Sequence, residues 1–171
     1  MYDNIIIIIA FGALLLASTY LVLNRILLSD ERRRNIELLK SSKSITVSMR
    51  LQAYERLILF MERISPDTLL LRQRSQARRN SDLHLAILQQ IRMEYEHNLS
   101  QQLYVSDKIW SCVKTTKEEI IMSINDLAKQ TDSNADSINL AKLILDKLIE
   151  DGESPVAETI KQIKAEARQI L

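Results

Sequence analysis

The stretch that decides the fold is VSMRLQAYERLILFMERISP, residues 47–66. Apolar side chains recur through it at alternating spacings of four and three residues, at Val47, Leu51, Tyr54, Ile58 and Met61. Three more, Leu57, Phe60 and Ile64, widen this face. This spacing places them on one face of an α-helix, and the face is wide enough to be buried against a neighbour. Ser65 and Pro66 end this helix and begin the next, because a serine can cap a helix and a proline in the first turn loses no hydrogen bond.

Further helices are predicted from their start and stop signals. Asn80 or Ser81 can cap one, Ser106 begins the next, Gly152 ends another as a C-terminal cap, and Ser154 begins the last. Each of these helices carries apolar residues at helical spacing, which we expect to form its buried face. In the order of the helices they are Leu88, Ile91, Tyr95 and Leu99 in the first; Ile109, Val113, Ile120, Ile124 and Leu127 in the second; Ile138, Ala141, Leu145 and Leu148 in the third; and Val156, Ile160, Ile163, Ala167 and Ile170 in the last.

The composition agrees with an all-α fold. The chain has two glycines and two prolines in 171 residues, too few for the frequent turns of a short β-rich fold. Its single cysteine excludes an intramolecular disulfide framework and fits a reducing compartment. We therefore expect a helical bundle or helical hairpins with short connections.

The N-terminal part contains a long uncharged segment, IIIIIAFGALLLASTYLVL at residues 5–23. As a helix it would span about 28 Å, close to the hydrocarbon thickness of a bilayer. The alternative is a cleaved signal peptide, which would begin with basic residues, whereas residues 1–4 carry one acid, Asp3, and no base. The sequence thus predicts an N-terminal transmembrane helix that is retained as an anchor.

Basic residues follow this segment and none precedes it. They are Arg25, Arg32, Arg33, Arg34, Lys40 and Lys43. Because such residues are retained on the cytoplasmic side, we expect a single-pass protein of the bacterial inner membrane with its N-terminus outside. The predicted organisation is an anchor with a basic juxtamembrane helix at residues 1–43, a polar break at residues 41–44, and a cytoplasmic α-helical domain at residues 44–171.

The net charge of +1 hides a gradient along the chain. Residues 25–100 carry 14 bases and 9 acids, whereas residues 101–171 carry 9 bases and 12 acids. This pattern suits contact with an anionic bilayer or head-to-tail pairing of chains, and it does not favour a dedicated nucleic-acid binder. The expected partners are therefore membrane lipid and either another membrane-complex protein or a second copy.

Two basic clusters are candidates for contact with lipid. Their members are Arg32, Arg33, Arg34, Arg72, Arg74, Arg78 and Arg79. The run at residues 72–79 could also be a solvated connector or touch nucleic acid, although it lacks the interleaved aromatic residues of a base-stacking surface.

One pair of residues suggests metal chemistry. Glu94 and His97 stand three residues apart and can face the same way on a helix, as in half of a di-iron site. The chain has no second Glu-x-x-His, and it lacks phosphate-binding and nucleophile motifs. We therefore expect no enzyme activity, no cofactor and no small-molecule substrate; a metal-dependent enzyme centred on Glu94 and His97 stays the alternative.

Two segments resemble a known family. RLQAYER at residues 50–56 with ERISP at 62–66, and EYEHNLSQQLYVSD at 94–107 with Trp110, are similar to segments of bacterial proteins of unknown function, short single-span helical proteins best represented in the Bacteroidota. The resemblance covers nearly the whole chain and implies an inner-membrane location but no activity. It suggests an interaction or organising surface made of Arg50, Tyr54, Glu55, Arg56, Glu94, Tyr95, Glu96, His97, Asn98 and Gln101.

These observations favour a non-catalytic, membrane-anchored interaction protein, an accessory, scaffold or assembly subunit of a membrane complex. Buried charges need partners, so we also expect the polar residues of the two segments to meet. The predicted cluster contains Arg50, Tyr54, Glu55, Glu94 and His97.

Overall fold

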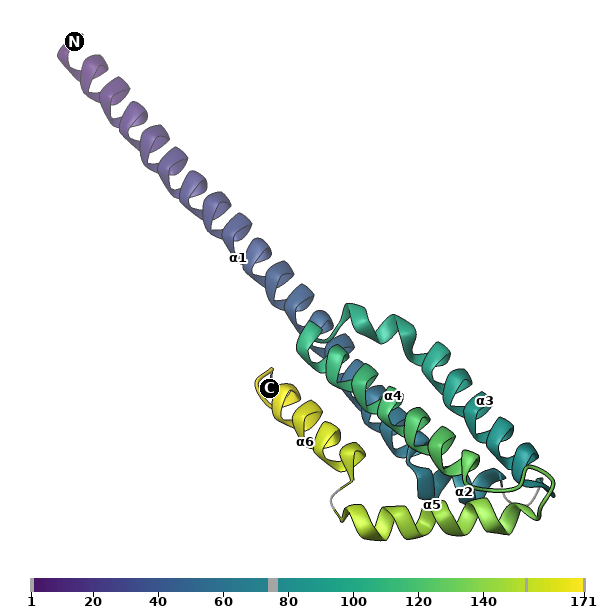
Figure 1. Ribbon diagram of the computed structural model, residues 1–171. Coiled ribbons are helices and arrows are strands. Elements are labelled where there is room, and N and C mark those ends of the chain that lie inside the picture. The colour runs from purple at the N-terminus through teal and green to yellow at the C-terminus, as the bar shows by residue number, and fades with distance from the viewer. Residues whose placement is uncertain (1, 74–76, 153, 171) are drawn as a thin grey trace. The chain divides into compact units, whose positions relative to one another are not determined.

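The computed structural model describes residues 2–73, 77–152 and 154–170, without the side chains of residues 2–11, 13, 22–24, 26–42 and 151. The described chain is helical throughout and contains no β-strand, as predicted; Arg79 and Asp136 form one isolated bridge. The elements are α1 (Tyr2–Ile64), α2 (Pro66–Gln73), α3 (Asn80–Asn98), the 3-10 helix η1 (Leu99–Leu103), α4 (Asp107–Lys129), α5 (Ser137–Asp151) and α6 (Pro155–Ala167) (Figure 1).

The chain divides into two compact units, residues 1–46 and 47–171. The first unit contains helix only, and its described apolar side chains at residues 14–16 and 20–21 are exposed. Within the portion of the chain that the structure describes, no helix is both long enough and apolar enough to cross a bilayer. The predicted span at residues 5–23 falls partly on side chains outside that portion, and the transmembrane helix is not confirmed.

The predicted break at residues 41–44 is wrong. Helix α1 continues through Ser41, Ser42, Lys43 and Ser44 without interruption. Relative to alanine, a serine or a lysine lowers the stability of a helix by at most about 0.7 kcal/mol. The segment contains neither glycine nor proline, the residues that most often end a helix.

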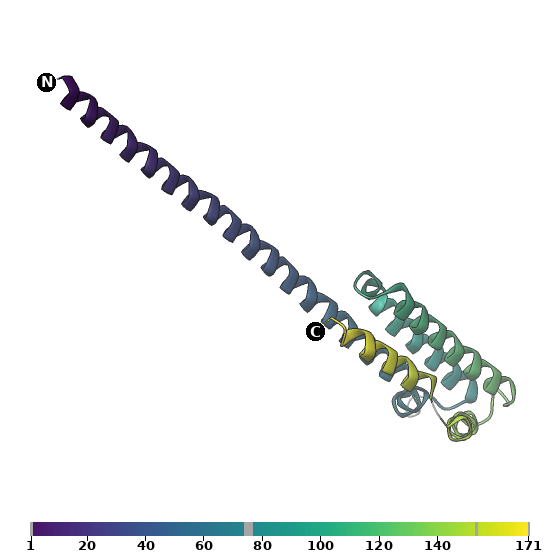
Figure 2. The same ribbon diagram turned by 90° about the vertical axis from the view of Figure 1, so that its left-hand side faces the viewer.

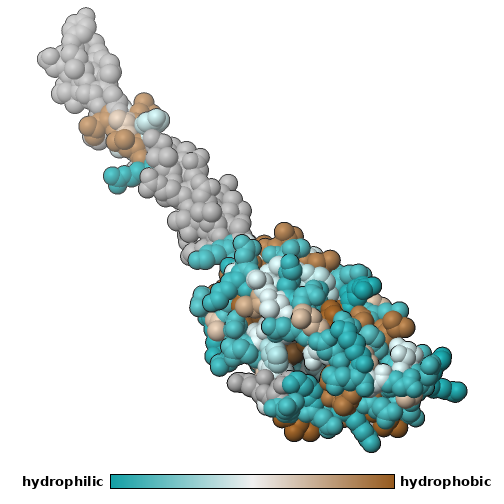
Figure 3. All heavy atoms as spheres, viewed as in Figure 1, coloured by the Kyte–Doolittle hydropathy of each residue, from teal (hydrophilic) through white to brown (hydrophobic). Residues whose placement is uncertain are grey.

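The second unit is a helical bundle built around one apolar core. Helices α3 and α4 run side by side, and α5 lies across their ends (Figure 1). In Figure 2 the view is along the axis of α5. The fully buried side chains of the core are Tyr54, Leu57, Phe60, Met61, Ile64, Leu69, Leu83, Ile87, Ile91, Ile109, Val113, Ile124, Leu140 and Ile163. On the face drawn in Figure 3, hydrophilic side chains cover most of this unit and hydrophobic ones are scattered among them.

Several predicted helix ends are confirmed. Ser106 caps α4 by accepting a hydrogen bond from the backbone of Ile109, and Ser154 caps α6 in the same way. Gly152 ends α5 with φ +68°, a conformation that a residue with a side chain rarely adopts. These local signals need no partner elsewhere in the chain, and they could be predicted for that reason.

The start of α3 differs from the prediction. Its N-cap is Arg79, and Asn80 lies inside the helix with 2% of its surface exposed. The Asn80 amide instead donates to the carbonyl of Asp132 (2.7 Å) and accepts from the backbone of Leu140 (3.1 Å). Asn80 therefore fixes the connector between α4 and α5 against α3.

In two helices, α3 and α5, the buried face differs from the predicted one by a rotation about the helix axis. In α3 the buried apolar residues are Leu83, Ile87 and Ile91, while Leu99 is exposed. In α5 they are Leu140, Ala141 and Ile144, and the expected Ile138 and Leu145 are exposed. Both helices carry apolar residues on more than one face, so spacing alone did not select the face that packs. The faces of α4 and α6 are as predicted, with Ile109, Val113, Ile120, Ile124, Val156, Ile160 and Ile163 buried.

Candidate interaction surface

A groove with a volume of about 460 Å³ lies between α1 and α3. Four residues of the surface suggested by sequence line it: Glu55, Arg56, His97 and Asn98. The remaining lining residues, which sequence reasoning missed, are Gln52, Leu59, Phe60 and Arg63. The missed residues lie three or four positions before or after Glu55, Arg56 or one another along α1, so a helical projection of residues 52–63 could have found them. We call this site the α1–α3 groove.

The α1–α3 groove combines an apolar base with polar walls. Phe60 is 1% exposed and belongs to the core, whereas the neighbouring Leu59 is 48% exposed. Asn98 is buried, and its amide nitrogen donates to the carbonyl of Glu94 (2.8 Å). A binding partner could therefore meet an apolar surface and several hydrogen-bonding groups at once.

Three ionisable side chains of the groove make no polar contact with the described part of the protein. Among the residues that the structure describes, Glu55, Arg56 and His97 have no hydrogen-bond or ion-pair partner. All three are exposed to solvent. They can therefore pair with an incoming molecule without first breaking a contact within the protein.

The fourth ionisable side chain of the groove, Arg63, is held in place. Its guanidinium donates to the Glu94 carboxylate (3.1 Å), which also lies 3.8 Å from Arg72 and accepts from Gln90 (3.1 Å). Glu94 is 8% exposed, and a buried carboxylate requires such partners. Glu94 thus joins α1, α2 and α3 and is not available to a ligand.

Arg50 and Tyr54 belong to a different cluster. The Arg50 guanidinium donates to the carbonyl of Tyr104 (3.0 Å) and to the Tyr54 hydroxyl (3.2 Å). Tyr54 in turn donates to Glu166 in α6 (2.7 Å), which also accepts from the backbone N–H (3.1 Å) and the hydroxyl of Ser106. We call this set the Glu166 cluster; it ties α6 to α1 and to the start of α4.

The Glu166 cluster shifts the acidity of two of its members. Burial alone would raise the pKa of Glu166, but hydrogen bonds from Ser106 and Tyr54 outweigh it and hold the pKa below its ordinary value. Burial, and then the hydrogen bond to Glu166, raise the pKa of Tyr54. The cluster therefore favours a charged Glu166 beside a neutral Tyr54.

The expectation of one polar cluster is wrong in consequence. Arg50 and Tyr54 lie in the Glu166 cluster, Glu94 pairs with Arg63 and Arg72, and Glu55 and His97 line the groove. The prediction failed because Glu166, 112 residues from Tyr54, carries no local signal of its contact.

The other residues of the suggested surface have mixed roles. Tyr95 stacks on Trp110 with ring centroids 5.8 Å apart and also lies beside Phe60 (6.1 Å). The ammonium group of Lys117 lies 4.2 Å from the Tyr95 ring, a cation–π contact. Tyr95 therefore packs α3 against α4; Gln101 is buried and Glu96 is exposed.

Glu94 and His97 belong to no larger group of potential metal ligands among the described residues. The part of the chain that the structure describes contains no group of three or more His, Cys, Asp or Glu side chains that could hold a metal ion. The only cysteine, Cys112, is half-buried and lies 3.1 Å from the amide oxygen of Gln162.

The candidate lipid-facing residues are only partly described. Arg72 lies near Glu94 and Arg79 pairs with Asp82 (3.5 Å), whereas Arg78 is exposed. Arg74 and the side chains of Arg32, Arg33 and Arg34 lie outside the described residues.

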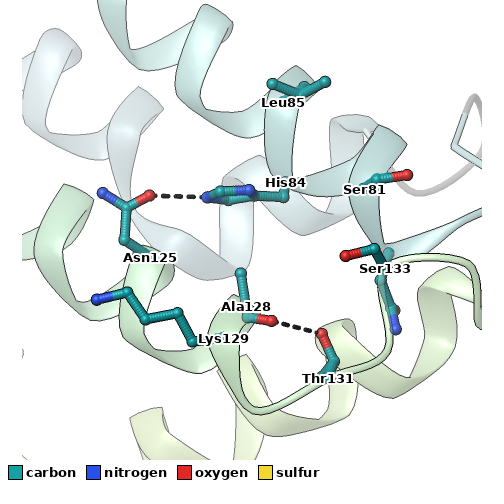
Figure 4. Close-up of a pocket in the computed structure, with 9 residues that line it drawn as sticks. Ser81, His84, Leu85, Asn125, Ala128, Lys129, Thr131 and Ser133 are labelled. Atoms are coloured by element: carbon teal, nitrogen blue, oxygen red, sulfur yellow. Dashed lines mark hydrogen bonds between the residues drawn. The ribbon is translucent and has the colours of Figure 1, made fainter.

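A second pocket, of about 510 Å³, lies where α3 begins and α4 ends (Figure 4). His84 points across it to Asn125, whose side-chain oxygen lies 2.7 Å from the histidine Nε2. Lys129 on its edge pairs with Asp126 (2.8 Å), and Thr131 donates to the carbonyl of Ala128 (2.9 Å). Of these contacts only the one between His84 and Asn125 joins α3 to α4, and the other two lie at the end of α4.

Comparison with known proteins gives one match. A family model described as a family of unknown function, DUF7935, matches residues 1–170. No curated protein and no solved structure matches the chain.

Proposed function

The chain belongs to the family of unknown function DUF7935, and we propose that it is a non-catalytic interaction protein that binds its partner through the α1–α3 groove. Its role would be that of an accessory, scaffold or assembly subunit of a membrane complex. The observation that carries the proposal is the set of three exposed ionisable side chains without a partner among the described residues, Glu55, Arg56 and His97, beside the apolar Leu59.

The chemistry of the α1–α3 groove indicates what the partner presents. An apolar side chain can cover the exposed Leu59, while a carboxylate can pair with Arg56 at the wall. A carboxylate accepts two parallel hydrogen bonds from a guanidinium, and such a pair fixes orientation as well as adding affinity. Because Arg56 is exposed, the pair is a rim contact, and reversing the charge at this position replaces the attraction by repulsion of the same carboxylate.

Two of the side chains that line the α1–α3 groove are held in place by contacts within the protein. Arg63 is held by Glu94, and Asn98 is held by the α3 backbone, so both walls of the groove are fixed before a partner arrives. A preformed surface spends less conformational entropy on binding than a mobile one.

Membrane attachment is part of the proposal. It is supported by the uncharged residues 5–23, by the bases that follow them, and by the exposed apolar side chains at residues 14–16 and 20–21 of α1. In this scheme the segment holds the chain in the bacterial inner membrane, and residues 47–171 meet the partner in the cytoplasm.

Copurification with charge-reversed variants tests the function. The full chain, tagged at its C-terminus, is solubilised from membranes, and its associated proteins are quantified for wild type, Arg56→Glu and Arg92→Glu. Arg92 is an exposed arginine of α3 that does not line the groove, which makes it a matched control. We expect Arg56→Glu to reduce recovery of a specific partner at least about tenfold, equivalent to about 1.4 kcal/mol, and Arg92→Glu to leave it unchanged. Equal recovery with both variants would contradict the proposal.

A further inference from the structure

Helix α5 carries apolar side chains on two faces. Leu140 and Ile144 are buried in the core, whereas Ile138, Leu145 and Ile149 are 38%, 44% and 79% exposed. The exposed three are separated by seven and four residues, so they fall within about 40° of one another around the helix axis. They therefore form an apolar stripe on a part of α5 that is turned away from the core.

This stripe is typical of a helix that packs on two sides. Single exposed apolar residues are common on protein surfaces. A helix that contributes to one core, however, carries one apolar stripe and has polar residues on the opposite side. Helix α5 forms one end of the second unit, where its outer side is open to another molecule (Figure 1).

Two side chains of opposite charge, Lys142 and Asp146, lie beside the stripe. Both are exposed, and neither has a hydrogen-bond or ion-pair partner among the residues that the structure describes. They stand four residues apart with the base first, and a pair within one helix is stronger when the acid comes first. Both charges can therefore pair with another molecule without breaking a contact within the chain. We call the stripe with these two charges the outer face of α5.

From these observations we propose that the outer face of α5 binds the same face of a second copy of the chain, with the two helices antiparallel. A dimer with a two-fold axis requires a face that complements itself. When the axis passes through the middle of the stripe, Ile138 lies opposite Ile149 of the second copy. Lys142 then covers Leu145 of that copy with its aliphatic stem and reaches Asp146 with its ammonium group. Each contact occurs twice.

The two charges select the antiparallel arrangement. In a parallel pair the same residues lie at the same level, so Lys142 would face Lys142 and Asp146 would face Asp146, and like charges repel. The antiparallel pair replaces both repulsions by attractions, and it sets the positive end of each helix dipole beside the negative end of the other. The apolar stripe thus supplies the buried surface, and the ion pairs fix the direction.

This pairing goes beyond the proposed function and does not depend on it. The α1–α3 groove is lined by residues of α1 and α3, so a dimer through α5 leaves both grooves available and presents them together. One helix pair buries less area than the roughly 1,200–2,000 Å² of stable interfaces. We therefore expect a weak and reversible dimer.

Disulfide crosslinking of the full chain, purified in detergent, tests the inference. The only natural cysteine is removed with Cys112→Ser, and two differently tagged variants, Ile138→Cys and Ile149→Cys, are mixed and oxidised. We expect the product that joins position 138 to position 149 to exceed either self-product about tenfold. Two copies of the same position lie at least about 16 Å apart in the antiparallel pair, whereas a disulfide spans about 7 Å between Cα atoms at most. Ser111→Cys, at an exposed position of α4, serves as control and should give no product with Ile138→Cys.

Charge reversal tests the ion pairs in the same mixture. Lys142→Glu in both variants should reduce the mixed product about tenfold, because it replaces two attractions by two repulsions. Adding Asp146→Lys reverses both charges and should restore the product. Lys114→Glu, at an exposed base of α4, is the matched control and should leave the product unchanged.

Self-products as abundant as the mixed product, or a doubly reversed variant that fails to recover, would overturn the inference. Circular dichroism establishes that each variant is folded. If a variant does not fold, zero-length carbodiimide crosslinking of the wild-type chain provides the second test, on a mixture of isotope-labelled and unlabelled copies. We expect a bond between Lys142 of one copy and Asp146 of the other; bonds within single copies only would contradict the pairing.

Discussion

The Tyr54 hydroxyl donates a hydrogen bond of 2.7 Å to the Glu166 carboxylate and so joins α1 to α6 across 112 residues. Glu166 also accepts from Ser106, the residue that caps α4. One carboxylate therefore meets three helices. Its negative charge lies at the N-terminal end of α4, where the helix dipole stabilises an anion.

Removing the Tyr54 hydroxyl should destabilise the second unit. We expect Tyr54→Phe to lower the free energy of unfolding by about 2 kcal/mol, because it removes the hydrogen bond donated to Glu166 and the one accepted from Arg50 and leaves the buried ring in place. Urea unfolding followed by circular dichroism measures this. Tyr104→Phe is the matched control, since Arg50 contacts the backbone of Tyr104 and not its hydroxyl. An equal loss in both variants would mean that the Tyr54–Glu166 bond contributes nothing specific.

The pH dependence of stability should report on Glu166. Hydrogen bonds from Ser106 and Tyr54 overcome the effect of burial and hold the folded-state pKa of Glu166 below its ordinary value of 4.5. The stabilisation is therefore present above that value and is lost as the pH falls through the folded-state pKa. Glu166→Gln should show a flatter decline in unfolding free energy between about pH 5 and pH 3 than wild type. Glu96→Gln, at an exposed carboxylate, should keep the wild-type slope; identical slopes for all three proteins would refute this role of Glu166.

The two arginines near Glu94 should contribute differently to the free energy of unfolding. Arg63 lies 3.1 Å from the carboxylate and Arg72 lies 3.8 Å away. We expect Arg63→Met to cost about 1–2 kcal/mol of unfolding free energy, because it removes a charge-assisted bond from a buried acid, and Arg72→Met to cost less. Chemical denaturation of both variants, with Arg92→Met as the exposed control, measures the order. A larger loss of unfolding free energy for Arg72→Met than for Arg63→Met would contradict the conclusion that Arg63 is the main partner of Glu94.

The turn between α5 and α6 should be sensitive to its glycine. We expect Gly152→Ala to destabilise the second unit by about 1–2 kcal/mol, because an alanine at φ +68° is strained even where no neighbouring atom is close. Ser154→Ala should cost about 1 kcal/mol through loss of the α6 cap. Thermal unfolding gives both values, and Ser111→Ala, at an exposed helical position, serves as reference. A fully stable Gly152→Ala variant would show that the turn adopts another conformation.

The parts of the fold that could be predicted are those coded locally. Ser106, Gly152 and Ser154 end or begin helices through contacts within a few residues, and α6 carries apolar residues on one face only. In α5 the exposed Ile138, Leu145 and Ile149 compete with the buried Leu140 and Ile144, so the face that packs is decided by neighbouring helices.

The candidate surface was predicted incompletely for the same reason. Residues 50–56 and 94–101 were identified as important, but their distribution among the groove, the Glu94 pairs and the Glu166 cluster depends on long-range contacts. Glu166 lies in an ordinary amphipathic helix, and the pocket that both Pro66 and Pro155 line requires residues from four helices. Neither pattern is visible in a single sequence.

Site-specific photocrosslinking in cells tests the central claim, that the α1–α3 groove is where a partner binds. A photoreactive amino acid is placed at Gln52, which lines the groove, and in a second strain at Gln89, an exposed residue of α3 outside it. We expect Gln52 to give a defined crosslinked product that disappears when Arg56→Glu is added and persists with Arg92→Glu, and we expect Gln89 to give none. The same product from both positions, or a Gln52 product that is insensitive to Arg56→Glu, would contradict the claim.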